Sequence, residues 1–134
     1  MSASRDQLEQ TLRSQLAAVT SIESAWLFGS RARDTARDRS DVDLAVRFVD
    51  GRAPAVTTTL DLASALTLAI GLEVEVIDVE RAPSDLVHRV LRDGRLLVER
   101  DRAARIAFEV AARNRYFDMA PLLREYRRLA DGVP

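Results

Sequence analysis

Hydrophobic residues recur along the chain at two spacings, and each spacing predicts one kind of element. The first is helical and begins after Ser4, which forms with Gln7 a pair typical of a helix N-terminus; the apolar residues at this spacing are Leu8, Leu12, Leu16 and Val19. We therefore expect an amphipathic N-terminal helix that packs on a sheet.

The second spacing is the alternation of a β-strand. Residues 25–28 are apolar and end at Gly29, which predicts a buried strand that runs into a turn. Between residues 41 and 49, apolar side chains occupy every second position, so Asp41 and Asp43 are expected together on the opposite face of one strand. Residues 30–40 have no hydrophobic period and predict a loop or one short helical turn.

The rest of the chain predicts another strand pair and three more helices. The first is a helix from about Val56 to Ile70 that stops at Gly71; its buried residues are expected to be Leu62, Leu66, Ala69 and Ile70. A strand follows within residues 72–79, with Glu73 and Glu75 on one face, and then a helix from Pro83 to about Arg92. The last two elements are a strand at residues 95–99 and a helix from Asp101 to Leu129 with a break or kink before Pro121. This order predicts an α/β or α+β fold with one mixed sheet flanked by helices. At 134 residues the chain fits a single domain, with a core at about 1–100 and a C-terminal helical extension at about 101–130.

Composition narrows the classes of function. All twenty basic residues are arginine, and many lie at 31–39 and 113–128, where they could meet phosphate or an acidic partner. The net charge is −1, and acidic residues are interspersed among the arginines of the last helix, so direct nucleic-acid binding is not expected. The absence of cysteine excludes disulfides and thiolate metal sites. No apolar run approaches the length of a membrane span and no signal-peptide core is present, so we expect a soluble cytoplasmic protein.

The candidate chemistry lies in Gly29 and Ser30, which are followed after ten residues by Asp41 and Asp43. Two carboxylates at i and i+2 of a strand project side by side and repel unless a cation lies between them, and oxygen ligands favour Mg²⁺. Glycine lets the backbone approach a phosphate, and the serine adds a hydroxyl and an N–H group. Of the nearby arginines we expect Arg33 to contact the phosphates. The competing interpretation is a glycine turn before an edge strand with solvated carboxylates.

The segment GSRARDTARDRSDVDLAV resembles the signature of the DNA polymerase beta-like nucleotidyltransferase superfamily. The short length and the layout are similar to the MNT class of minimal nucleotidyltransferases, notably the MntA-like antitoxins. The later segments EVEVIDVERAPSDLVHRVLRDGRLLVERD and RYFDMA resemble that class as well.

The resemblance implies a minimal nucleotidyltransferase fold and transfer of a nucleoside monophosphate, usually AMP from ATP, with two Mg²⁺ ions. Asp41 and Asp43 would bridge one ion. Glu75 stands where the family usually has aspartate and would be the third metal ligand or the general base. Asp78 is the alternative if the strand register differs. The interpretation without a function is that Glu73 and Glu75 are two surface glutamates on an exposed strand face. Asp34 stands where the family commonly has glycine.

The resemblance also implies a partner. MntA-like antitoxins bind a helical HEPN-domain ribonuclease toxin and adenylylate a tyrosine on it, so a hetero-oligomer with such a toxin is expected. Two alternatives stay open. Glu75 and Asp34 could mark a catalytically weak protein that neutralises its toxin by binding alone, or the acceptor could be RNA or a small molecule such as an aminoglycoside.

Four aromatic residues near these motifs are expected to pack rather than react. His88 has no second ligand at metal spacing, and Trp26 falls within a predicted buried strand. Tyr116 and Phe117 are expected to pack against the sheet, or else to contribute to a partner interface.

Overall fold

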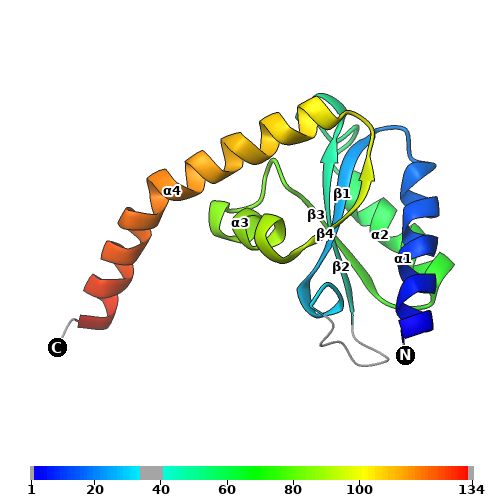
Figure 1. The fold of residues 1–134 in the computed structure, drawn as a ribbon, viewed down its shortest axis with the longest axis horizontal. Coiled ribbons are helices and arrows are strands. Elements are labelled where there is room, and N and C mark those ends of the chain that lie inside the picture. Colours follow the sequence, from blue (N-terminus) through cyan, green and yellow to red (C-terminus); the bar gives the residue numbers. More distant parts are fainter. Residues whose placement is uncertain (1, 34–40, 133–134) are drawn as a thin grey trace.

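The computed structural model describes residues 2–33 and 41–132, which form a four-stranded sheet with two helices on each face (Figure 1). In chain order the elements are α1 (Ser2–Ala17), β1 (Ile22–Phe28), the 3₁₀ turn η1 (Gly29–Arg31), β2 (Val42–Phe48), the 3₁₀ turn η2 (Val49–Gly51), α2 (Thr58–Ile70), β3 (Val74–Asp78), α3 (Ser84–Asp93), β4 (Arg95–Glu99) and α4 (Arg102–Gly132). The order of helices and strands is the one that the sequence predicts.

The sheet is mixed, with strand order β3-β2-β1-β4. β1 pairs in antiparallel orientation with β2 and with β4. β2 and β3 are parallel, so the chain must cross from one end of the sheet to the other between them, and α2 makes this crossing. The central strands β1 and β2 are buried along most of their length.

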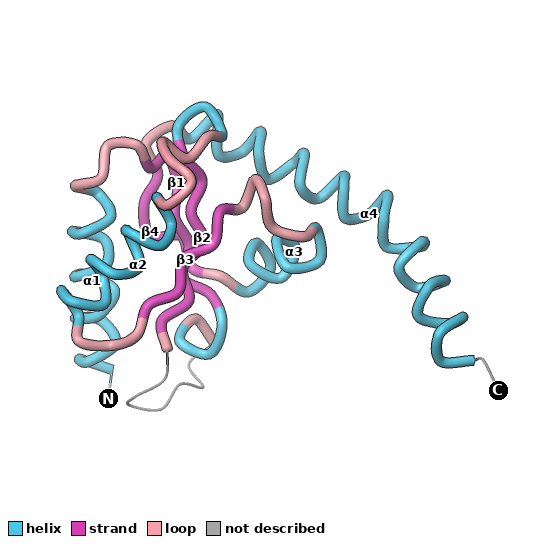
Figure 2. Tube along the Cα trace, turned by 180° about the vertical axis from the view of Figure 1, so that it is seen from behind, coloured by secondary structure: helices cyan, strands magenta, loops and turns pink. Residues whose placement is uncertain are grey.

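Alternation along the strands produces two apolar clusters, one on each face of the sheet. Val42, Leu44, Val46 and Phe48 face α1 and α2 and pack with Leu12, Leu16, Leu62 and Leu66. On the other face, Trp26 and Ala45 pack with residues of α3 and α4: Val87, Val90, Phe108 and Ala112. Figure 2 shows the same layering from behind, with α1 and α2 on one side of the strands and α3 and α4 on the other.

Several predicted boundaries are wrong by a few residues. α1 already begins at Ser2, so Ser4 is not its first residue. β1 begins at Ile22 rather than near Ala25, because its N-terminal part also pairs with β2 and β4. α2 begins at Thr58, and Ala69 is exposed rather than buried, whereas Gly71 ends the helix with φ of 80° as expected.

α4 is one continuous helix of 31 residues that includes Pro121, so of the predicted break or kink before this proline the break does not occur. Proline removes one backbone hydrogen bond, and on an exposed helix the carbonyl it leaves unpaired can be solvated. The helix bends along its length, and its C-terminal half extends away from the sheet and the other helices (Figures 1 and 2). No helix in the described part of the chain combines the length and the apolar character that a membrane crossing requires.

Candidate active site

Asp43 and Glu75 occupy paired positions on two neighbouring parallel strands. The register of β2 and β3 places Asp43 beside Glu75, and Asp41 lies two residues before Asp43, immediately ahead of β2. Burial raises the pKa of the Asp43 carboxyl; the charges of Glu75 and Asp41 and a hydrogen-bonding contact with Glu75 raise it further. Three carboxyl groups therefore interact at one end of the sheet, an arrangement that is unfavourable when all are ionised.

Gly29 approaches this carboxyl cluster from the antiparallel strand. Phe28, the last residue of β1, pairs with Asp43, and the chain then turns at Gly29 with φ of 74°. A Cβ atom at Gly29 would lie 2.5 Å from Oδ2 of Asp43. Glycine is therefore required here both by the left-handed backbone and by the proximity of the carboxylate.

The turn that follows Gly29 holds the other residues of the predicted phosphate site. Gly29–Arg31 form one 3₁₀ turn, in which the amides of Ala32 and Arg33 both donate to the Gly29 carbonyl, at 3.2 and 3.3 Å. Ser30 thus lies one residue from the glycine that contacts Asp43. The Arg33 side chain is exposed. Asp34, the other residue of interest in this segment, lies outside the described residues.

The charge of Arg33 acts on Asp93, the last residue of α3. The pKa of Asp93 is lowered, mainly by its hydrogen bonds with Arg92 and also by the positive charges of Arg92 and Arg33. Arg92 donates to both Asp93 carboxylate oxygens, at 3.0 and 2.9 Å. The end of α3 is thus a second element beside the glycine turn, which the sequence motifs do not indicate.

The strand register distinguishes the two acidic residues of β3. Glu75 pairs with Asp43, whereas Asp78 pairs with Val46, three positions further along. The carboxylate of Asp78 accepts a hydrogen bond from the Glu80 amide at 2.9 Å and forms an ion pair with Arg81 at 3.9 Å. Glu75 is exposed at its strand position and Asp78 is buried, so only Glu75 is available beside Asp43.

The donor set fits a magnesium–triphosphate complex better than a metal site made only by protein. Within residues 2–33 and 41–132, no group of three or more histidine, cysteine or acidic side chains is placed to hold a metal ion by itself. Mg²⁺ is usually bound by one or two carboxylates and completes its coordination with water and substrate phosphates. Asp41 and Asp43 can supply these carboxylates, and a cation there would offset the repulsion that raises the pKa of Asp43.

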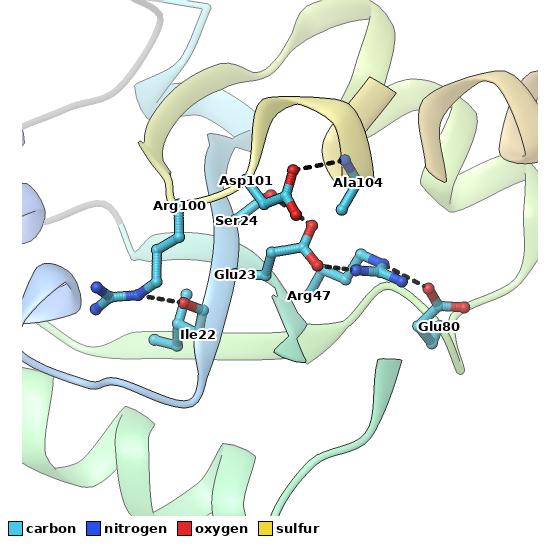
Figure 3. Close-up of polar contacts among 8 residues, drawn as sticks. All are labelled: Ile22, Glu23, Ser24, Arg47, Glu80, Arg100, Asp101 and Ala104. Atoms are coloured by element: carbon cyan, nitrogen blue, oxygen red, sulfur yellow. Dashed lines mark hydrogen bonds and ion pairs between the residues drawn. The ribbon is translucent and has the colours of Figure 1, made fainter. Parts of the chain in front are cut away.

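The same face of β2 carries a partly buried ionic cluster four residues beyond Asp43 (Figure 3). Arg47 forms ion pairs with Glu23 of β1 and with Glu80 after β3, the latter at 2.8 Å between Nε and Oε1. Its guanidinium also lies 5.7 Å from the ring centroid of Phe108 in α4. The cluster joins three segments that are far apart in the sequence, and alternation alone gave no signal for it.

The aromatic residues pack largely as expected. Trp26 is buried, with its ring centroid 6.0 Å from that of Phe108. His88 stacks on Tyr116 at 3.7 Å between nearly parallel rings, so α3 rather than the sheet holds Tyr116. Phe117 meets both rings edge-on and remains 62% exposed.

Comparison with protein families finds one matching family model, described as "Polymerase beta, Nucleotidyltransferase", over residues 9–103. The matched stretch contains the glycine turn and all three carboxyl groups of the cluster. A comparison with curated protein sequences finds no match.

Solved structures share the fold over most of the chain. A toxin-antitoxin structure with AMP-PNP has a TM-score of 0.76 at 23% identity and covers 92% of this chain and 96% of its own. An MNT antitoxin in complex with tri-AMPylated HEPN toxin, from Shewanella oneidensis, has a TM-score of 0.72 at 21% identity, covering 96% and 97%. A minimal nucleotidyltransferase has a TM-score of 0.57 at 28% identity, covering 68% and 93%. The fold is that of a minimal nucleotidyltransferase with a long C-terminal helix.

Proposed function

Because the chain belongs to the polymerase beta nucleotidyltransferase family, we propose that it transfers AMP from ATP to a tyrosine hydroxyl of a HEPN-domain ribonuclease toxin and so acts as an antitoxin. The observation that carries this proposal is the pairing of Asp43 with Glu75 beside the Gly29 turn. It places the Asp43 carboxylate, the Glu75 carboxylate and the glycine turn together at one end of the sheet, and we assign to them metal binding, proton acceptance and phosphate binding.

Each residue has a defined role in the proposed reaction. Asp41 and Asp43 would hold Mg²⁺, and the bound ion would supply positive charge beside the triphosphate. The Gly29–Ser30 turn and Arg33 contact the phosphates. Glu75 accepts the proton of the acceptor hydroxyl, or ligates a second Mg²⁺ that orients this oxygen.

The covalent change is a single displacement at the α-phosphorus. The hydroxyl oxygen of the acceptor forms the new bond to phosphorus, and the bond from this phosphorus to the oxygen that bridges to the β-phosphate breaks. Pyrophosphate leaves with the electron pair of that bond, and the hydroxyl proton passes to Glu75. Asp43 and Glu75 lie on adjacent strands, so metal binding and proton transfer can act on the same phosphorus.

The choice of nucleotide and acceptor is supported by the structural relatives. One was crystallised with AMP-PNP, and another is an MNT antitoxin in complex with an AMPylated HEPN toxin.

The test is a transfer assay with the cognate HEPN-domain protein. The two proteins are purified separately, mixed with Mg²⁺ and ATP, and examined by intact-mass spectrometry and tryptic mapping. We expect the partner to gain the mass of one or more AMP groups on tyrosine, and the doubly substituted Asp41→Asn/Asp43→Asn chain to add none. An unmodified partner in a mixture where the complex has formed would contradict the transferase proposal and favour neutralisation by binding.

A further inference from the structure

One face of α4 carries mostly apolar residues, which follow one another at alternating spacings of four and three positions. Its N-terminal half has Phe108, Ala112 and Arg115 at these spacings, and its C-terminal half continues with Met119, Leu122, Tyr126 and Leu129. We call these positions the α4 seam. Such a repeat averages 3.5 residues and keeps one face of a helix against a partner helix.

The two halves of the α4 seam differ in burial. Phe108 and Ala112 are each only 5% exposed, because they pack with β1 and α3 in the apolar cluster on that face of the sheet. Met119, Leu122, Tyr126 and Leu129 are 42%, 70%, 73% and 53% exposed. This half extends beyond the rest of the fold in both views (Figures 1 and 2), so within the described chain no other element covers it.

We propose that the C-terminal half of the α4 seam binds an amphipathic α-helix of a second, different protein, whose flanking residues are basic. The inference deepens the proposed function and rests on it in identifying that protein as the acceptor. The spacing favours a helix as the occupant, because a seam with a 3.5-residue repeat is the surface along which two α-helices pack against each other.

The charges along the seam determine which helix fits. Asp118 and Glu125 directly precede Met119 and Tyr126, so the two acidic residues lie seven apart along one edge of the seam. The opposite edge carries Leu123 and Ala130. Glu125 also pairs with Arg128 at 2.6 Å, but an exposed pair of this kind contributes little and can be exchanged for an intermolecular one. Arg124, Arg127 and Arg128 lie outside the seam and outside both of its edges, so they do not face the helix that occupies it. A partner helix with lysine or arginine beside its apolar residues therefore complements the acidic edge.

A second copy of the chain fits this surface poorly. If two α4 helices packed antiparallel, equivalent edges would face each other and Asp118 and Glu125 would meet the same carboxylates of the other copy. If they packed parallel, the two folded bodies would lie at the same end, where Phe108 and Ala112 are already covered by their own sheet and α3. Both arrangements are unfavourable, and a heterologous helix avoids both.

The experiment uses two synthetic helical peptides of about three heptads, with the same leucine seam and either lysine or glutamate at the flanking positions. Like charges on each peptide keep it from pairing with itself. Binding to the full chain is measured by fluorescence anisotropy without nucleotide. We expect the lysine-flanked peptide to bind at least about tenfold more tightly than the glutamate-flanked one. The charge-reversal variant Asp118→Lys/Glu125→Lys should reverse this preference.

Leu122→Asp/Tyr126→Asp should weaken binding of the lysine-flanked peptide by at least about tenfold. Leu68→Asp, at a position 87% exposed on α2, is the matched control and should leave it unchanged. The proposal is overturned if neither peptide binds, if both bind equally, or if sedimentation shows a homodimer that the seam variant converts to monomer. Mg²⁺–ATP binding and AMP transfer are measured separately, so an inactive chain that still selects the lysine-flanked peptide contradicts only the transferase proposal.

Discussion

Oδ2 of Asp43 occupies the space that a side chain at Gly29 would need. An added Cβ would lie 2.5 Å from this oxygen, and the backbone at Gly29 has φ of 74°. Any substitution there must displace either the glycine turn or the carboxylate, and both belong to the candidate active site.

Gly29→Ala should therefore weaken binding of Mg²⁺ with a non-hydrolysable ATP analogue by at least tenfold and lower stability by about 1–2 kcal/mol. Isothermal titration and urea unfolding measure the two effects. Gly71→Ala is the matched control, because Gly71 has φ of 80° but no atom within 4 Å of an added Cβ. It should lose stability and keep nucleotide affinity. Wild-type affinity in Gly29→Ala would show that the turn does not contact the nucleotide.

Asp43→Asn should stabilise the metal-free protein while abolishing transfer. Burial and the charges of Glu75 and Asp41 raise the pKa of Asp43 above its usual value of 3.8, so ionisation of this group opposes folding. This loss of folding stability is absent below pH 3.8, where the carboxyl is protonated in both states. It grows as the pH rises toward the raised pKa and is complete above that pKa. The variant should therefore gain a few degrees in Tm at neutral pH, and this gain should disappear on acidification.

The same variant separates the metal role from the structural one. If the proposed site holds Mg²⁺, the ion should raise the Tm of the wild-type chain but not that of Asp43→Asn. Asp118→Asn, on the exposed part of α4, should retain the response. An equal Mg²⁺ response in wild type and Asp43→Asn would mean that the ion binds elsewhere.

Glu75 variants test the identity of the third carboxylate. Glu75→Gln should lower the rate of AMP transfer by about a hundredfold or more with little change in the affinity for the nucleotide, because it removes the proposed proton acceptor without disturbing the turn. Glu75→Asp should retain activity. If Glu75→Gln transfers at the wild-type rate, Glu75 is a surface residue. An inactive wild type beside an active Glu75→Asp would identify a chain that acts mainly by binding.

Arg47→Ala should destabilise the fold far more than loss of a surface ion pair. It leaves Glu23, which is 6% exposed, without its ionic partner and removes a contact with Phe108. Loss of one partner from a buried pair costs roughly 3–5 kcal/mol, whereas the exposed Arg128–Glu125 pair is expected to contribute less than about 1 kcal/mol. Urea unfolding of Arg47→Ala and Arg128→Ala compares them directly. Equal losses of unfolding free energy in the two variants would show that the Arg47 cluster stabilises the fold no more than an exposed ion pair does.

The double substitution Glu23→Gln/Arg47→Met provides the control for this interpretation. If the cost of Arg47→Ala arises from an unpaired carboxylate, the double variant should recover a large part of the stability. No recovery would assign the loss to packing around Phe108 instead.

The sequence predicts local features of this fold more accurately than pairings between distant segments. β4 is found at its predicted bounds because a short apolar run lies between a glycine turn and charged residues. The face shared by Asp43 and Arg47 follows from strand alternation. By contrast, the choice between Glu75 and Asp78 depended on the register of β3 against β2, which local pattern does not determine.

The errors have related causes. Glu23 interrupts the apolar run that predicts β1, and the strand nevertheless starts before it because this part pairs with β2 and β4 and the Glu23 carboxylate forms an ion pair with Arg47. Pro121 predicts a break, but α4 continues because its C-terminal half does not depend on close packing with the rest of the fold. The roles of the candidate site residues themselves remain predictions until the variants above are measured.

The parallel pairing of β2 with β3 has a consequence for the order of folding. Asp43 and Glu75 come together only after the chain has passed through α2 and returned to the same end of the sheet. Hairpin pairing of β1 with β2 can form earlier, since it joins segments that are closer in sequence, and it would bring Gly29 to Asp43 without Glu75. We therefore expect a refolding chain to gain its glycine turn first and the complete carboxyl cluster last, so that Mg²⁺ binding follows closure of the crossover.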